Sequence, residues 1–326
     1  MSGVVVLAGG VGGARFLRGV REAERRSADP RPITAIVNTG DDAWLAGLRI
    51  TPDLDSIMYT LAGVNDEARG WGRVGESERV SAELRAYGVG WPWFTLGDLD
   101  LGTHIARTSW LREGLPLSAV VDRLQERWPL GIRMLPMSDD QVETHVEVED
   151  GRLLHFQEWW TRYRASLPAR RFVQVGIESA EPAPGVLDAI SAADVILLAT
   201  SNPVVSIGTV LAVRGIRDAV RAASAPVIGV SPIIAGAAVR GMADACLQAI
   251  GVETSAAAVA RHYGPRRADG LLDGWLVDDA DRDACAELAD EGVRVSSRPL
   301  LLKDLDESAA IVDAAYALAA GPGGRR

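Results

Sequence analysis

A short apolar strand that ends in a cluster of glycines most constrains what this chain can fold into. Residues 3–8 are a continuous Val-rich run, which is typical of a strand buried on both faces. The run breaks into the glycine-rich residues 9–15, after which Phe16, Leu17 and Val20 follow at helical spacing. A strand, a glycine loop and a helix in this order aim free backbone N–H groups at a phosphate. The sequence therefore predicts an α/β fold with a phosphate-binding loop after its first strand.

The glycine loop only partly matches the dinucleotide-binding fingerprint. Gly10 and Gly12 have the required spacing, but Arg15 occupies the position of the third glycine. We interpret the segment as a phosphate loop in which Arg15 adds a bidentate contact to the anion. Two alternatives stay open: glycines that merely permit a tight turn, and an NAD-dependent dehydrogenase. The dehydrogenase is disfavoured because no ribose-binding acid lies at the expected distance beyond the loop.

Residues 33–59 concentrate acidic side chains after a second apolar run, residues 33–37. Four carboxylates on two short loops cannot all stay ionised and close together unless a cation or a proton offsets their charge. Mg²⁺ is the cation that suits such ligands, completing its shell with water and substrate phosphate. The alternative is that aspartates cap turns and helix starts. The predicted metal ligands are Asp41, Asp42, Asp53 and Asp55.

Length, cysteine content and charge limit the class of protein. A chain of 326 residues can form one large α/β domain or a domain with an inserted lobe. The apolar start lacks the basic region of a signal peptide, and no apolar run approaches membrane-spanning length. Two cysteines, Cys246 and Cys285, exclude a disulfide framework and favour a reducing cytoplasm. A net charge of −10 disfavours nucleic acid as a partner.

Several apolar strands are expected to end in small, polar or glycine-rich loops. In a doubly wound, mostly parallel sheet all such loops meet at one edge, where ligands bind. Glycine and serine loops beside aspartates point to phosphoryl or nucleotidyl chemistry more than to hydride transfer. The later strands are expected at residues 172–177, 194–199, 226–230, 274–277 and 293–296, with helices at 185–193 and 308–320. The predicted nucleotide-binding residues are Gly9, Gly10, Gly12, Gly13, Arg15, Ser201, Asn202, Pro203, Ser231, Pro232 and Gly236.

Residues 61–135 are mostly helical by pattern and contain most of the tryptophans, which more often form a core or an oligomer contact than a cofactor site. Asp150 and Gly151 predict a β-hairpin that carries His145 and His155 on its two arms. Zinc binding there would lack a cysteine ligand. We therefore predict a Rossmann-like nucleotide-binding core, residues 1–60 and 171–326, and an inserted helical lobe with the hairpin, residues 61–170.

Taken together, these motifs resemble the CofD/FbiA family, the transferases of deazaflavin coenzyme F420 biosynthesis. The matching pieces cover nearly the whole chain in order: LAGGVGGARFL, VNTGDDAWLAGLRITPDLDSIMYTL, RGWG, LGDLDLGTHIART, LPMSDDQVETHVE, HFQEWWTRYR, SNPVVSIG and SPIIAGAAVRG. Two mild departures are Thr51, where the family often has Ser or Cys, and Ser56, where Thr is usual.

The resemblance implies a Mg²⁺-dependent transfer onto the deazaflavin precursor FO. The donor is enolpyruvyl- or lactyl-2-diphospho-5′-guanosine, GMP is released, and a homodimer is expected with the aromatic lobe as a candidate interface. The enolpyruvyl donor is preferred on resemblance alone. We expect Asp41 and Asp55 to be catalytic, with one carboxylate of the acidic set as general base. The residues expected to bind FO are Asp55, Ser56, Asp98, His104, Met137 and Ser138.

The competing hypothesis is a regulatory protein that binds a nucleotide sugar and catalyses nothing. A gluconeogenesis-related branch of the broad family shares the glycine loop and the SNP-like loop. The HFQEWW motif, residues 155–160, and the acidic step between Thr51 and Ser56 favour the transferase branch.

Overall fold

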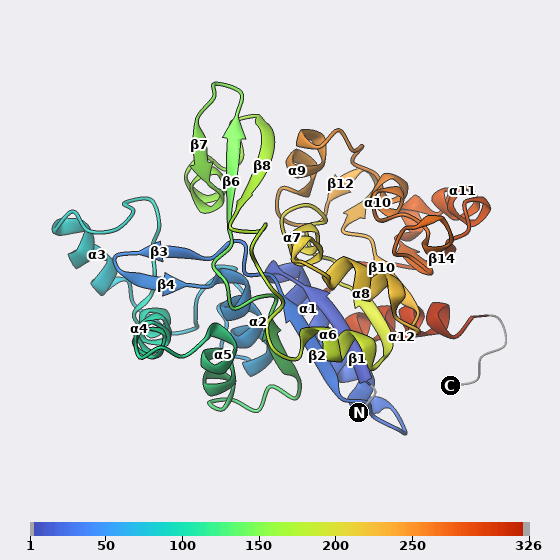
Figure 1. The fold of residues 1–326 in the computed structure, drawn as a ribbon, viewed down its shortest axis with the longest axis horizontal. Coiled ribbons are helices and arrows are strands. Elements are labelled where there is room, and N and C mark those ends of the chain that lie inside the picture. Colours follow the sequence, from blue (N-terminus) through green and yellow to red (C-terminus); the bar gives the residue numbers. More distant parts are fainter. Residues whose placement is uncertain (1–2, 322–326) are drawn as a thin grey trace.

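The computed structural model describes residues 3–321, and a seven-stranded parallel sheet forms its centre (Figure 1). The strand order is β14-β13-β10-β9-β1-β2-β5, and every pairing is parallel. The predicted α/β, Rossmann-like, doubly wound class is thereby confirmed. The strands are β1 (Gly3–Ala8), β2 (Ile33–Val37), β5 (Arg133–Pro136), β9 (Ala193–Leu198), β10 (Val227–Val230), β13 (Gly274–Val277) and β14 (Arg294–Ser297).

Helices cover both faces of this sheet, and β1 shows why. Its side chains alternate between two hydrophobic clusters, with Val4 and Val6 in one and Val5 and Leu7 in the other. The first cluster lies under α1, α2, α5 and α12, and the second under α6 to α11. These helices are α1 (Gly10–Arg26), α2 (Pro52–Ala62), α5 (Leu117–Gln125), α6 (Val186–Ser191), α7 (Ile207–Ala212), α8 (Ile216–Ala222), α9 (Ala243–Ala249), α10 (Ala256–Tyr263), α11 (Ala284–Asp290) and α12 (Leu305–Ala320).

Smaller elements extend away from the sheet. The hairpin predicted at Asp150-Gly151 is confirmed, with Gly151 at a φ of 86°. Figure 1 shows the antiparallel sheet β7-β6-β8 projecting to one side of the sheet, and the β3–β4 hairpin with α3 projecting to another. Their bounds are β3 (Ala43–Leu45), β4 (Leu48–Ile50), α3 (Arg79–Ala86), α4 (Asp98–Arg112), β6 (Glu143–Val148), β7 (Leu153–His155), a π-helical turn (Glu158–Arg162), β8 (Ala169–Val175), β11 (Ile233–Ile234) and β12 (Ala237–Ala238).

Two expectations about strands need correction. The strand predicted at residues 172–177 as part of the parallel sheet is instead β8, which pairs antiparallel with β6. Its side chains are half-buried or exposed, which an antiparallel sheet tolerates and a central parallel strand does not. The edge strand β5 lies in a segment that we read as mostly helical, because four residues ending in proline carry little strand pattern. The division into a core and an inserted lobe stays a prediction, although β5 lies within residues 61–170 and joins the central sheet.

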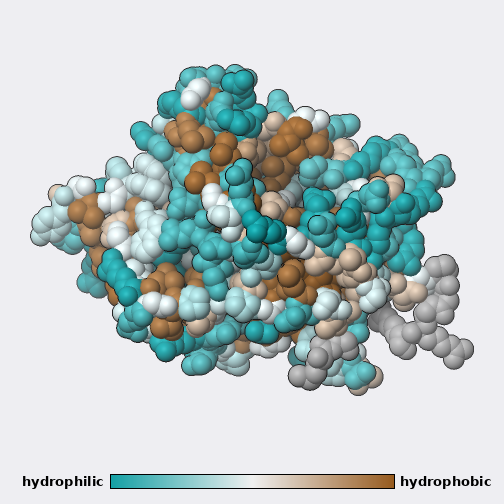
Figure 2. All heavy atoms as spheres, in the orientation of Figure 1, coloured by the Kyte–Doolittle hydropathy of each residue, from teal (hydrophilic) through white to brown (hydrophobic). Residues whose placement is uncertain are grey.

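The distribution of hydrophobic residues on the surface and the character of the helices both bear on the requirements of a membrane span. On the face shown in Figure 2, hydrophobic residues form separate patches among hydrophilic ones. Within residues 3–321, no helix combines the length and the apolar character that crossing a membrane requires.

Two glycine-to-alanine changes test the packing of the sheet. A Cβ on Gly229 of β10 would lie 2.4 Å from the ring of Trp275, which is fully buried on β13. We expect Gly229→Ala to lower the free energy of unfolding by about 1–3 kcal/mol, because the indole must shift within a filled core. The matched control is Gly102→Ala on the exposed side of α4, where a Cβ meets nothing within 4 Å. That change should stabilise by up to about 1 kcal/mol through helix propensity. Urea denaturation followed by circular dichroism measures both, and equal effects would contradict the packing argument.

Candidate active site

The loops that follow β1 and β9 meet at the carboxyl edge of the sheet. The Gly9 N–H donates to Ser201 Oγ over 3.0 Å, and this hydroxyl donates to the Gly9 carbonyl oxygen over 2.7 Å. Because β9 and β2 both pair with β1, the loop after β2 lies at the same edge. The predicted convergence of loops far apart in the sequence is therefore present.

The glycines serve mainly to bring α1 close to its neighbours. The helix begins at Gly10, so the predicted glycine loop shortens to Gly9 alone. A Cβ on Gly12 would lie 2.5 Å from the Thr200 carbonyl oxygen, and one on Gly13 would lie 2.7 Å from Ser201 Oγ. A Cβ on Gly9 would lie 2.5 Å from Asp53 Oδ2. The N-cap residue Gly9 has no side chain to cap α1, and the Gly10 N–H at the start of the helix bonds the Asp53 carboxylate. The positive dipole end of α1 therefore lies beside the acidic pair, where it favours an anion or a cation-bound phosphate.

Asp41 and Asp53 form a buried acidic pair without a cationic partner among residues 3–321. Asn38, which follows β2, donates from Nδ2 to Asp53 Oδ2 over 2.9 Å, and its Oδ1 accepts from the Gly40 N–H over 2.9 Å. Asp41 Oδ1 is buried and has no hydrogen-bond partner there. Burial raises the pKa of Asp53 to about 6, and burial together with the charge of Asp53 raises the pKa of Asp41 well above its usual value. This pair fits a divalent cation, which would satisfy the unpartnered oxygen and balance the charge.

Asp42 and Asp55 differ from that pair because buried arginines balance them. Arg49 Nη2 lies 3.5 Å from Asp42 Oδ2, and Arg107 Nη2 contacts Asp55 Oδ1. Thr51 Oγ1 also donates to Asp55 Oδ2 over 3.2 Å. Burial raises the pKa of both carboxyls, and the two guanidinium groups oppose that rise. The four aspartates that the sequence grouped as one set therefore divide into two pairs with different charge balance.

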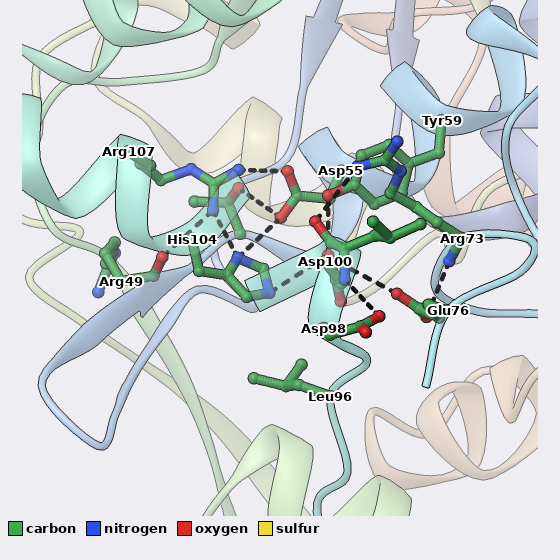
Figure 3. Close-up of polar contacts among 12 residues, drawn as sticks. Arg49, Asp55, Tyr59, Arg73, Glu76, Leu96, Asp98, Asp100, His104 and Arg107 are labelled. Atoms are coloured by element: carbon green, nitrogen blue, oxygen red, sulfur yellow. Dashed lines mark hydrogen bonds and ion pairs between the residues drawn. The ribbon is translucent and has the colours of Figure 1, made fainter. Parts of the chain in front are cut away.

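His104 links Asp55 to a second buried carboxylate, Asp100 (Figure 3). Arg107 Nη1 lies 2.8 Å from His104 Nδ1, and a guanidinium can only donate, so Nδ1 accepts and Nε2 carries the proton. His104 Nε2 lies 3.3 Å from Asp100 Oδ1, and the hydroxyl of Tyr59 donates to the same oxygen over 2.8 Å. Burial favours a raised pKa for Asp100, but His104 and Tyr59 together lower it.

Asp55, Asp100 and His104 also bring possible metal-ligand atoms within 4.8 Å of one another. Arg107 already supplies a positive charge at this cluster, which opposes a second cation. The Asp41–Asp53 pair is therefore the better metal position. The hairpin histidines face each other across β6 and β7, with ring centres 5.3 Å apart.

The residues that we expected to bind FO have different surroundings in the structure, and their role stays a prediction. Asp98 accepts hydrogen bonds from the N–H and the hydroxyl of Ser77 at the start of α4. Met137 is fully buried in the core, and buried Ser138 donates to the Glu181 carbonyl oxygen over 2.6 Å. His104 is 3% exposed and belongs to the buried network. Of the predicted set, Ser56 lines a cavity.

The later predicted nucleotide loops are shaped by their own side chains. Asn202 Oδ1 accepts from the N–H groups of Val204 and Val205 over 2.9 and 3.2 Å. Ser231 donates to the Ile233 carbonyl oxygen over 2.8 Å. Pro203 and Pro232 are buried, and Gly236, at a φ of 73°, lies in the turn between β11 and β12. These contacts hold both loops in fixed shapes at the edge of the sheet.

A cavity that is open to solvent lies beside the start of α1. Sequence reasoning missed Arg240 and Trp71 as parts of this site, although both lie in quoted family segments, SPIIAGAAVRG and RGWG. Neither residue has a local pattern that distinguishes it from other surface arginines and tryptophans. The cavity is lined by Val11, Arg15, Arg18, Ser56, Tyr59, Thr60, Asn65, Glu67, Gly70, Trp71, Gly72 and Arg240.

Comparison with known proteins agrees with the motif analysis. Residues 4–301 match the family model described as 2-phospho-L-lactate transferase CofD. A Thermobifida fusca protein named phosphoenolpyruvate transferase is 58% identical over 97% of both chains. A Streptomyces griseus protein of the same name is 56% identical over 97% of this chain and 98% of its own.

Among solved structures, a Bacillus halodurans protein superimposes with a TM-score of 0.61 over 95% of this chain and 99% of its own, at 20% identity. At that identity the likeness shows the fold alone. The family match covers both the sheet and the acidic stretch, and it confirms the resemblance drawn from the motifs. The chain therefore belongs to the CofD family of transferases.

Proposed function

We propose that this protein moves a phosphoenolpyruvyl group from enolpyruvyl-2-diphospho-5′-guanosine to the ribityl hydroxyl of FO, giving dehydro coenzyme F420-0 and GMP. The observation that carries this proposal is the similarity to phosphoenolpyruvate transferases, 52–58% identical over 97% of the chain. We further propose that the enzyme requires Mg²⁺ and acts as a cytoplasmic homodimer. The lactyl donor, 2-phospho-L-lactyl transfer, is the second candidate reaction because the family model carries that name.

The reaction asks for positioning and charge stabilisation more than for covalent chemistry. The ribityl oxygen of FO forms a bond to the distal phosphorus of the donor, and the bond between that phosphorus and the GMP oxygen breaks. The hydroxyl proton passes to a carboxylate of the protein. The N-terminus of α1, which follows Gly9, is suited to bind the diphosphate.

We assign Mg²⁺ to Asp41 and Asp53, because this pair alone among the four aspartates lacks an arginine partner within the described chain. The bound cation would neutralise charge on the diphosphate. Asn38 holds Asp53 in place through its 2.9 Å hydrogen bond.

We assign the role of general base to Asp55. Burial raises the pKa of its carboxyl, which makes the carboxylate a better proton acceptor than an exposed aspartate. Arg107, fully buried, orients it through the contact with Oδ1. Substitution of a metal ligand is therefore expected to affect Mg²⁺ binding, whereas substitution of the general base is expected to affect turnover alone.

The regulatory alternative is not favoured, because the similar full-length proteins carry transferase names. The Bacillus halodurans structure does not decide between the two, since it shows only the shared fold. Fluorescence titration with FO separates them. Tight binding of a UDP-sugar without binding of FO would support the regulator.

Mass spectrometry of the products tests the proposed reaction directly. Purified protein with FO, Mg²⁺ and the enolpyruvyl donor should form dehydro coenzyme F420-0 and GMP. The lactyl donor in a parallel reaction should react more slowly. Absence of product with both donors, at saturating Mg²⁺, would contradict the proposed function.

Single aspartate-to-asparagine variants test the two roles. Asp41→Asn should lose turnover by about 100-fold or more together with Mg²⁺ binding, because a ligand to the cation is removed. Asp55→Asn should lose comparable turnover but keep Mg²⁺ affinity. Steady-state rates and calorimetric titration of Mg²⁺ with GDP present measure both. The control is Asp218→Asn on the exposed helix α8, which should leave both quantities unchanged.

The acidic pair also predicts an unusual pH dependence of stability in EDTA. A rise in the pKa of Asp53 from 3.8 to about 6 means that the folded state binds the proton more tightly than the unfolded state. Stability therefore falls as pH rises from about 4 to 6, and the penalty of about 3 kcal/mol is fully present above pH 6. Asp53→Asn should be more stable than the wild type at pH 8, with an advantage that shrinks toward pH 4. Urea denaturation at both pH values measures this, and a variant less stable at pH 8 would contradict the account.

A further inference from the structure

We propose that the cavity beside α1 receives the carboxylate of the transferred three-carbon group, and that Arg15 and Arg240 bind it. The inference rests on the proposed function and names the part of the donor that this cavity recognises. It concerns the cavity lined by Arg15, Ser56, Tyr59, Trp71 and Arg240, which we call the arginine cavity.

The arginine cavity begins next to the acidic pair. Ser56 lies three residues after Asp53 on α2, which is about one helical turn away. On the other side, Val11 lines the cavity and follows Gly10, whose Cβ would lie 3.8 Å from Asp53 Oδ1. A group attached to a phosphate held at Asp53 therefore has an adjoining space to enter.

The arginine cavity carries more positive charge than its own residues balance. Arg18 Nη1 is paired with Glu67 Oε1 over 2.6 Å. Within residues 3–321, the side chains of Arg15 and Arg240 have no such ion pair or hydrogen bond with a carboxylate. Burial lowers the pKa of Arg15, and the charge of Arg240 lowers it further, so the two guanidinium groups repel each other. An anion placed between them would relieve that repulsion.

The chemistry of the donor selects which anion this is. In the proposed function the diphosphate is bound by the acidic pair with its cation and by the positive end of α1. The remaining anionic group of the donor is the carboxylate of the three-carbon acid, and a guanidinium binds carboxylates in bidentate fashion. Val11 and Trp71 add apolar surface beside the arginines for the methylene carbon.

Isothermal titration without FO tests this inference, because no turnover then occurs. The probes are the enolpyruvyl donor and GDP, which lacks the three-carbon acid, each with Mg²⁺. In the wild type the donor should bind more tightly than GDP. Arg240→Gln and Arg15→Gln should each weaken binding of the donor by about 10- to 100-fold. For Arg240→Gln, binding of GDP should change by less than about twofold. Arg25→Gln, at the exposed far end of α1, is the matched control and should change neither.

Each other outcome overturns the inference. Equal losses for the donor and GDP in Arg240→Gln would place this arginine on the diphosphate. Unchanged donor binding with a raised KM for FO would make the cavity part of the FO site. Donor binding no tighter than GDP binding in the wild type would show that the carboxylate is not recognised.

The titration and the product analysis fail independently. If the wild type forms no product but binds the donor more tightly than GDP in an arginine-dependent way, the proposed function fails and the carboxylate site stands. If product forms but both arginine variants bind the donor as tightly as the wild type does, the proposed function stands and the carboxylate site fails. Arg240 is exposed on the loop after β12, so its substitution leaves the core intact, and thermal denaturation checks this.

Discussion

The burial of four carboxylates at one edge of the sheet is the constraint on which the rest of the site depends. A carboxylate removed from water is stable as an anion only when a cation or hydrogen-bond donors replace its hydration. Buried arginines supply a cation to Asp42 and Asp55, whereas Asp41 and Asp53 have no cationic partner among residues 3–321. Asp53 accepts a hydrogen bond from Asn38, and Asp41 Oδ1 has no partner there. That asymmetry, more than the number of acidic residues, distinguishes a metal position from a structural ion pair.

The arginines that balance the second pair come from outside the central sheet. Arg49 lies on β4 of the small hairpin, and Arg107 lies on α4. Arg107 also donates to the Arg49 carbonyl oxygen over 3.2 Å, so the two elements hold each other in position. The β3–β4 hairpin and α4 therefore balance charge at the edge of the sheet, in addition to any contact with substrate. Without it, all four carboxylates would compete for protons and cations at the same edge.

Local patterns predicted the parts of the fold that depend on neighbouring residues. The run of valines before Gly9, the acidic loop after β2 and the Asp150-Gly151 turn each carry their own signal. The sequence predicted a strand near β8 but assigned it to the wrong sheet, because the pattern of a strand does not show which other strand it pairs with. The division of the aspartates was missed for a related reason. Nothing near Arg49 or Arg107 in the sequence indicates that either guanidinium is buried against a carboxylate.

The same reasoning explains why the arginine cavity was invisible in the sequence. Arg15 lies just after the glycines, so the sequence indicated that it binds an anion. Arg240 is distant from it in the sequence, after β12, although both side chains line the same cavity. Together they place positive charge in a cavity that adjoins the acidic pair through Val11 and Ser56. The loop after β9 is held at Gly9 by the hydrogen bonds of Ser201. In the proposed reaction this arrangement gives the donor a direction. The nucleotide would lie toward the Ser201 loop and the transferred acid toward the arginines, so that the bond to be broken spans the cation between them.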